Sequence, residues 1–176
     1  MFNADVCALT GDGQPQLVLL DLDGTLIDSV PDLAAATDNM LVALGRNAAG
    51  PQQVAHWVGN GADMLVRRAL AEGNEDAALA LDADEVSLAR QHFDDAYLAC
   101  LHNATGAFDG VDEFLQTIEA KKVLVTNKPR LFTEPLIRSL GWQAYFQFLL
   151  FGDDLAEKKP SPVPVLHACK ETGIKP

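Results

Sequence analysis

Leu17-Val18-Leu19-Leu20-Asp21-Leu22-Asp23-Gly24-Thr25-Leu26 is the stretch on which the fold of this chain depends. Its first four residues are apolar and predict a buried strand, while the acids, glycine and threonine that follow predict a polar turn. Side chains alternate between the faces of a strand, so Asp21 and Asp23 point the same way if the extended backbone continues that far. Ligands of open parallel sheets bind just beyond the carboxyl ends of the strands. The stretch therefore predicts a functional site at these two acids.

Two carboxylates at such a spacing repel each other unless a cation or a shared proton compensates. The arrangement favours a metal-assisted site in which one carboxylate attacks and the other moves protons. A purely structural interpretation is also open, because acids after a strand are common turn residues. The apolar run before Asp21, the second acid Asp23, and the Gly24-Thr25 pair after it favour the functional interpretation.

The composition is that of a folded, acidic protein. The 176 residues are enough for one domain with a real core and an inserted subdomain. Apolar residues make up 48% and charged residues 22%, as in globular rather than disordered chains. The net charge of −12 argues against nucleic acid or an anionic membrane as a partner. An anionic substrate is still compatible with it, because a few local cations and backbone donors can outweigh the global field.

The N-terminal segment and the cysteines bear on localisation. Residues 1–16 have neither the basic start nor the apolar core of a signal peptide. No apolar run approaches the ~20 residues needed to span a bilayer. The three cysteines, Cys7, Cys100 and Cys169, are odd in number and far apart, which fits neither a disulfide framework nor a zinc site. We therefore expect a reduced, cytoplasmic protein.

The segment from Ser29 to Leu101 has a helical pattern and no convincing strand. A helix start is predicted at its beginning. Ser29 can cap the helix, Pro31 suits the first turn, and Asp32 lies near the positive end of the helix dipole. Further helices are predicted over residues 51–57, 62–71 and 84–102. We interpret residues 29–104 as an inserted, all-helical cap domain.

Beyond this insertion, strands and helices alternate. Apolar strands are predicted at residues 123–125 and 148–151, and helices over residues 111–118, 131–140 and 163–172. Pro135 is expected to interrupt the early part of the second of these helices. Such alternation calls for a parallel sheet with right-handed crossovers. The predicted fold is α/β, with a core formed by residues 16–28 and 105–176.

Three motifs together resemble those of the haloacid dehalogenase superfamily. Asp21-Leu22-Asp23-Gly24-Thr25 resembles its first motif, Thr126-Asn127 its second and Lys159-Pro160 its third. The helical insertion matches the position of the small C1-type cap, and the resemblance implies a Rossmann-like core. Within the superfamily the chain is most similar to the phosphoglycolate phosphatases, through Thr126-Asn127-Lys128-Pro129, Gly152-Asp153-Asp154 and Lys158-Lys159-Pro160.

This resemblance implies a role for each acid and for the lysine. Asp21 would attack phosphorus and form an aspartyl-phosphate. Asp23 would give a proton to the departing alkoxide and then take one from the attacking water. Mg²⁺ would sit between Asp21, the phosphate and the backbone carbonyl of Asp23. Lys159 would offset the negative charge of Asp21 and the phosphate.

The resemblance also implies contacts to the substrate. The hydroxyl of Thr126 and nearby backbone N–H groups would hold phosphate oxygens. The residues expected to bind substrate are Gly24, Thr25, Thr126, Asn127, Asn60 and Gly61.

Purely structural interpretations of these positions stay open. Thr126 and Asn127 could simply end a strand and support a turn, and Gly59-Asn60-Gly61 could be only a turn between helices. Arg67 and Arg68 could reach a substrate carboxylate or face the solvent. The histidines show no metal spacing and receive no role.

The favoured function is that of a Mg²⁺-dependent phosphatase acting on a small phosphorylated metabolite, above all 2-phosphoglycolate, which it would convert to glycolate and phosphate. A sugar-phosphate mutase of the same superfamily is an alternative, because it shares the two-acid motif. A non-catalytic binding module that kept the fold and lost the metal site is another. A haloacid dehalogenase is less favoured, since it does not need an acid at the position of Asp23.

The resemblance further implies a fourth motif, whose acids complete the metal site after a strand that follows the helix near Thr172. The sequence given ends at Pro176, before such a strand. Gly152-Asp153-Asp154 precedes Lys159 whereas the fourth motif follows it, so we interpret these acids as the loop after the third strand. We therefore expect an incomplete sheet, weak Mg²⁺ binding and slow hydrolysis for residues 1–176.

Overall fold

A three-stranded parallel sheet forms the centre of the part of the chain that the structure, a computed structural model, describes: residues 14–176. Its strands are β1 (Leu17–Leu20), β4 (Lys121–Val125) and β5 (Phe148–Leu150), in the order β1-β4-β5, and both pairings are parallel. The prediction of an α/β fold with a parallel sheet is confirmed. The interpretations of residues 1–13, Cys7 included, lie outside the described residues.

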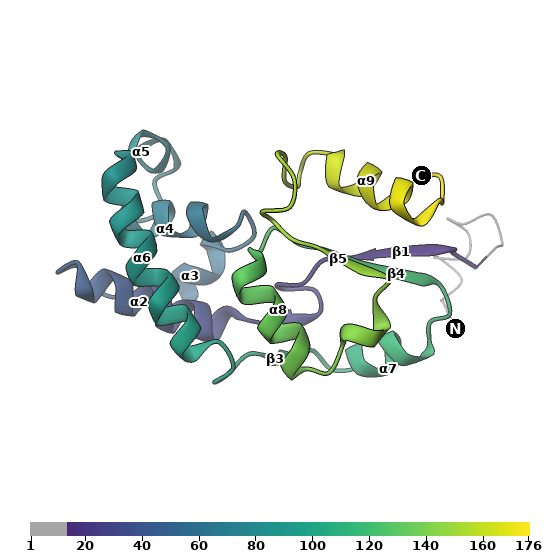
Figure 1. Cartoon of the computed structure of the whole chain (residues 1–176). Helices are drawn as coiled ribbons and strands as arrows, with labels where there is room; N and C mark the ends of the chain where they lie inside the picture. The colour runs from purple at the N-terminus through teal and green to yellow at the C-terminus, as the bar shows by residue number, and fades with distance from the viewer. Residues whose placement is uncertain (1–13) are drawn as a thin grey trace.

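Helices cover both faces of this sheet (Figure 1). Helices α7 (Val111–Thr117) and α8 (Arg130–Ser139) lie on one side and α9 (Val163–Thr172) on the other. The short 3-10 helix η1 (Gln143–Tyr145) precedes β5. Alternate residues of β4 serve the two faces: Leu124 belongs to the apolar cluster of α8, while Val123 and Val125 pack with Ala168 of α9. This alternation is the period of two that the geometry of a strand imposes.

A helical part is inserted between two very short strands. The strands β2 (Ile27–Asp28) and β3 (Gly106–Ala107) pair antiparallel. Between them lie α2 (Val30–Ala43), α3 (Pro51–Trp57), α4 (Ala62–Leu70), α5 (Glu75–Ala80) and α6 (Ala83–Cys100), which gather at the left of Figure 1. The sequence analysis missed α5 and the pairing of β2 with β3. Both are too short to show a period, and the two strands meet only because the chain returns to the sheet after α6.

Helix α2 begins where the sequence analysis predicted it, with Pro31 and Asp32 in its first turn, but one of the reasons given for that start is wrong. Ser29 makes no capping hydrogen bond; its Oγ donates to Asp23 Oδ1 at 2.5 Å. A cap would accept from a backbone N–H of the first turn, whereas here the hydroxyl is turned toward the carboxylate of Asp23. Asp32 is 2% exposed, and its carboxylate accepts hydrogen bonds from the backbone N–H groups of Ala104 and Thr105. Asp32 therefore ties the segment that leaves α6 to the beginning of α2.

Pro135 does not interrupt α8, which is a correction to the sequence analysis. The helix runs unbroken from Arg130 to Ser139 with Pro135 inside it. Phe132, Leu136 and Ile137 of this helix are 1% exposed or less. A proline inside a helix loses one backbone hydrogen bond, and the burial of these three side chains outweighs that loss.

Aromatic side chains join the helical part to the sheet. The rings of Phe93 and Tyr97 on α6 lie 6.3 and 4.9 Å from the ring of Phe132 on α8, measured between centroids. All three side chains are 1% exposed or less. Such aromatic pairs stabilise beyond the area that they bury. This contact places one face of α6 next to the carboxyl ends of the strands.

None of the helices within residues 14–176 has the length and apolar character that a membrane span requires.

Candidate active site

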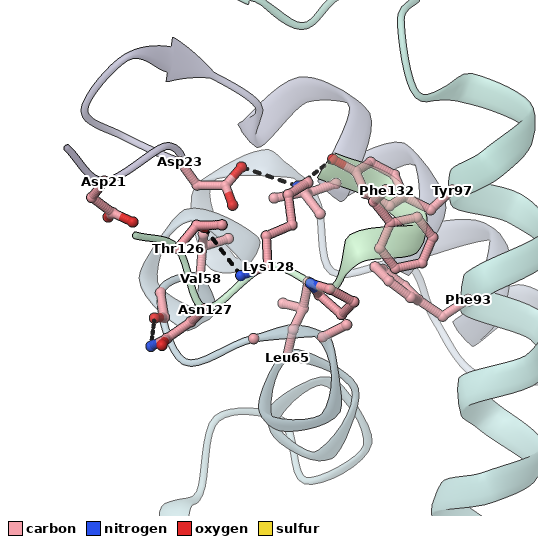
Figure 2. A pocket seen from close by; sticks show the side chains of 15 residues that line it. Asp21, Asp23, Val58, Leu65, Phe93, Tyr97, Thr126, Asn127, Lys128 and Phe132 are labelled. Carbon is pink, nitrogen blue, oxygen red and sulfur yellow. Dashed lines mark hydrogen bonds and ion pairs between the residues drawn. The ribbon is translucent and has the colours of Figure 1, made fainter. Parts of the chain in front are cut away.

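The chemically promising side chains meet at the carboxyl ends of the parallel strands. Asp21 directly follows β1, Thr126 directly follows β4, and Lys159 follows β5. The pocket at this edge is lined by the turn after β1, the loop before α4, the face of α6 and the segment after β4 (Figure 2). Its cavity volume is about 40 Å³.

Asp21 is paired with Lys159, as the resemblance implied for their positions. Lys159 Nζ donates to Asp21 Oδ1 at 2.6 Å. The side chain of Asp21 is 40% exposed and that of Lys159 27% exposed. A half-exposed carboxylate with one oxygen held by a cation can present its other oxygen to a ligand in the pocket.

Asp23 has a lysine of its own. Its Oδ1 accepts hydrogen bonds from Ser29 Oγ at 2.5 Å and from Lys128 Nζ at 3.0 Å, and its side chain is 14% exposed. Both acids line the same pocket. The compensation that two neighbouring carboxylates need is therefore supplied by two separate cations, Lys159 and Lys128.

Lys128 is the residue of the site that the sequence analysis missed. Its side chain is 4% exposed, and Nζ donates to both Asp23 and the hydroxyl of Tyr97, the latter at 2.7 Å. The sequence analysis used Lys128 only as part of a motif and gave Tyr97 no role. The available signal was the need of Asp23 for a counter-charge, which a lysine three residues after the end of a strand can satisfy.

Tyr97 carries the clearest perturbation in this pocket. Burial raises the pKa of Tyr97 far above its ordinary value, and the negative charge of Asp23 adds to the shift. The hydroxyl therefore keeps its proton at neutral pH.

Asn127 joins three loops through its side-chain amide. Its Nδ2 donates to the backbone carbonyls of Gly59 and Lys159, both at 3.0 Å, and its Oδ1 accepts from the backbone N–H of Lys159 at 3.0 Å. Gly61 lies against the same residue: a Cβ there would be 3.0 Å from the backbone oxygen of Asn127. Gly61 and Asn127, two of the predicted substrate-binding residues, both line the pocket. The side-chain amide of Asn127 is hydrogen-bonded to backbone groups of the protein. Their contact with substrate stays a prediction.

The other predicted substrate-binding residues divide into two groups. Thr126 is buried beside the pocket, and its hydroxyl oxygen accepts from the backbone N–H of Lys128, which leaves the O–H free to donate. Gly24 and Thr25 form an exposed turn whose N–H groups donate to Ile27 and Leu22, and Asn60 accepts from Arg68. Gly24, Thr25 and Asn60 are not among the described residues that line this pocket.

The remaining charged candidates have partners away from the pocket. Arg67 pairs with Asp63 at 2.9 Å and Arg68 with Glu75 at 2.7 Å. The carboxylates of Asp153 and Asp154 accept from the backbone N–H and the guanidinium of Arg130. These contacts agree with the interpretation of residues 152–154 as an ordinary loop.

The oxygen atoms at this edge fit a magnesium ion only in part. Mg²⁺ is usually bound by one or two carboxylates together with substrate phosphates and waters. The carboxylate of Asp21 and the backbone carbonyl of Asp23 are ligands of this kind. Residues 14–176 contain no cluster of three or more metal-binding side chains. The set fits an ion that the substrate helps to hold.

Replacing Asn127 with alanine should lower the free energy of unfolding by about 2 kcal/mol, because three hydrogen-bonding groups of the Gly59 and Lys159 loops lose their partner. Urea unfolding of the two chains measures the difference. Asn103→Ala is the matched control, since Asn103 is exposed. Equal stability of the two variants would show that the loops do not depend on this amide.

Comparison with known proteins agrees with this architecture. Residues 18–176 match the family model of haloacid dehalogenase-like hydrolases. The chain is 47% identical over 163 residues to a phosphoglycolate phosphatase of Pseudomonas fluorescens, and 47% identical over 168 residues to one of Pseudomonas putida. Its fold is similar, with a TM-score of 0.83 and 33% identity, to the crystal structure of a predicted phosphoglycolate phosphatase from Haemophilus somnus.

These matches cover most of this chain but a smaller share of each relative. The alignments include 91% and 92% of this chain but only 59% and 60% of the two Pseudomonas proteins. The Haemophilus structure is covered to 73% and this chain to 92%. The chain thus spans about three fifths of the length of the curated relatives that it matches first.

Proposed function

Because this chain belongs to the family of haloacid dehalogenase-like hydrolases, we propose that it hydrolyses a small phosphomonoester with Asp21 as the nucleophile. The observation that carries the proposal is the ion pair of 2.6 Å between Asp21 and Lys159 at the carboxyl end of β1. A carboxylate that is oriented by a cation and open to a pocket is suited to attack a phosphorus atom.

The proposed reaction has two displacements. An oxygen of Asp21 attacks phosphorus, the P–O bond to the alcohol breaks, and the alkoxide takes a proton from Asp23. Water, giving a proton back to Asp23, then attacks the aspartyl-phosphate and releases inorganic phosphate. Lys159 and the hydroxyl of Thr126 are the protein groups suited to stabilise the phosphoryl oxygens during both steps.

Magnesium is part of the proposal. Asp21 and the backbone carbonyl of Asp23 would hold the ion, and the ion would supply positive charge to the phosphate oxygens. Its charge would add to that of Lys159, which pairs with Asp21, beside a phosphate that brings further negative charge.

The proposed substrate is 2-phosphoglycolate. This rests on the names of the Pseudomonas relatives at 47% identity. Val58, Gly59 and Gly61 of the loop before α4 line the pocket, so this loop lies where a phosphomonoester would bind. We propose residues 29–104 as the cap whose movement opens the pocket, and the hydrogen bond from Asn127 to Gly59 as a contact that this movement breaks.

The wider setting is proposed from charge and cysteine chemistry. The net charge of −12 favours a small metabolite rather than nucleic acid or an anionic membrane as the partner. Among the described residues, Cys100 and Cys169 form no disulfide, which is typical of proteins of the cytoplasm.

The proposal is tested by incubating the chain with 2-phosphoglycolate and Mg²⁺ and measuring inorganic phosphate. We expect phosphate release that stops when EDTA removes the ion. Transfer of the phosphoryl group to a second hydroxyl without release of phosphate would indicate a mutase instead. Binding of 2-phosphoglycolate without either reaction would indicate a binding module.

A further inference from the structure

The end of the pocket away from Asp21 contains a second polar pair. Figure 2 shows the side chain of Lys128 reaching between Asp23 and Tyr97. Lys128 Nζ lies 3.0 Å from Asp23 Oδ1 and 2.7 Å from the Tyr97 hydroxyl. The Lys128 side chain is 4% exposed and the whole of Tyr97 is 0% exposed, yet both residues line the pocket. They are buried groups that a ligand in the pocket can reach.

This pair has hydrogen-bond donors to spare. An ammonium group has three N–H donors and a phenol has one O–H donor. Within residues 14–176, Lys128 Nζ has two acceptors, Asp23 and Tyr97. The Tyr97 oxygen accepts from Lys128, and no described residue accepts its proton. Because burial raises the pKa of Tyr97, that proton stays in place. One N–H and one O–H donor therefore remain for a ligand.

The surroundings make these donors selective. The side chains of Phe93, Phe132 and Leu65 line the same pocket, and these side chains offer no acceptor. A donor in such a setting binds an acceptor more strongly than it would in water, and a cationic donor favours an anion. A carboxylate has two oxygens with which to accept from both donors at once.

The distance to Asp23 sets where such an anion lies on the substrate. In the proposed reaction Asp23 gives its proton to the ester oxygen, so this oxygen lies within a hydrogen bond of Asp23. Lys128 Nζ is one further hydrogen bond away, at 3.0 Å. A group attached one carbon beyond the ester oxygen comes within reach of Lys128 and Tyr97.

We propose that Lys128 Nζ and the Tyr97 hydroxyl form a subsite for a carboxylate on the carbon next to the phosphate ester, so that the substrate class is the phosphate esters of short 2-hydroxy acids. This inference rests on the proposed function and adds the residues that select the substrate. Other roles of the two residues, such as holding Asp23 in place, would not discriminate between esters with and without a carboxylate.

The test compares 2-phosphoglycolate with ethyl phosphate, in which a methyl group replaces the carboxylate. Dissociation constants are measured by calorimetry in the presence of Mg²⁺, and phosphate release is followed in parallel. For Tyr97→Phe we expect the preference for 2-phosphoglycolate over ethyl phosphate to fall about tenfold, and for Lys128→Met about a hundredfold, since hydrogen bonds to charged groups have effects of this size. Tyr145→Phe and Lys170→Met are the matched controls, and neither residue lines the pocket.

Two results would overturn the proposal: an equal loss of affinity for both esters, or an unchanged preference in both variants. An equal loss means that Lys128 only positions Asp23. The phenylalanine variant removes a single oxygen from Tyr97, so it provides the answer even if Lys128→Met does not fold. The proposed function fails separately, if neither ester releases phosphate, and the binding preference is still measurable in that case.

Discussion

Replacing Asp21 with asparagine is expected to reduce phosphate release from 2-phosphoglycolate by more than about a thousandfold, relative to the unchanged chain. The amide of asparagine has no negative charge with which to attack phosphorus, so the first displacement cannot begin. The loss should appear in kcat, and no labelled phosphoenzyme should form from a substrate with labelled phosphate.

The fold of this variant should be retained. Asp21 and Lys159 are both partly exposed, 40% and 27% for the side chains, and pairs of this kind contribute about 0–1 kcal/mol to stability. Asp109→Asn is the matched control, because Asp109 is exposed on the loop before α7. Activity in Asp21→Asn equal to that of the control would mean that another residue is the nucleophile.

Replacing Gly152 with alanine should cause a large loss of stability, about 3 kcal/mol in the free energy of unfolding. Gly152 follows β5, and its backbone N–H donates to the carbonyl of Lys128 at 3.0 Å. A Cβ at this position would overlap the backbone carbonyl of Asn127. Backbone atoms cannot move aside as a flexible side chain can, so the two loops would have to separate.

This prediction is measured by urea unfolding, with Gly106→Ala as the control. A Cβ at Gly106 would meet no atom within 4 Å, and its backbone needs no left-handed conformation. Because Asn127 and Lys128 belong to the pocket, Gly152→Ala should also weaken binding of 2-phosphoglycolate. A stable variant with unchanged binding would show that the approach of the two loops is looser than the structure has it.

The elements that the sequence predicted best are those long enough to show a hydrophobic period, or those with an apolar run that ends at polar or glycine residues. The apolar run before Asp21 predicted β1, and the runs before Thr126 and Gly152 predicted β4 and β5. The alternation of strands with helices predicted that they are parallel. The elements that it missed, α5, β2 and β3, have six, two and two residues, which is too few for a period to show.

The candidate site was predictable where its residues follow strands. Asp21, Thr126 and Lys159 lie where parallel strands end, and such ends meet at one edge of a sheet whatever else the chain does. Ser29 stands at the start of α2 as expected, but only the folded turn shows that its hydroxyl donates to Asp23 and makes no capping hydrogen bond. Asn127 lies at the pocket as expected, but only the folded loops show that its amide is already used by Gly59 and Lys159.

The sequence by itself determined the sheet, the edge at which the candidate site lies, and the family to which the chain belongs, because short-range patterns of apolar, acidic and glycine residues specify all three. Only the tertiary structure decided which groups face each other across the pocket. Tyr97 lies 31 residues before Lys128, and Asp23 lies 105 residues before it. No local pattern links such positions; packing of α6 on α8 brings them together, and so decides which lysine balances which acid.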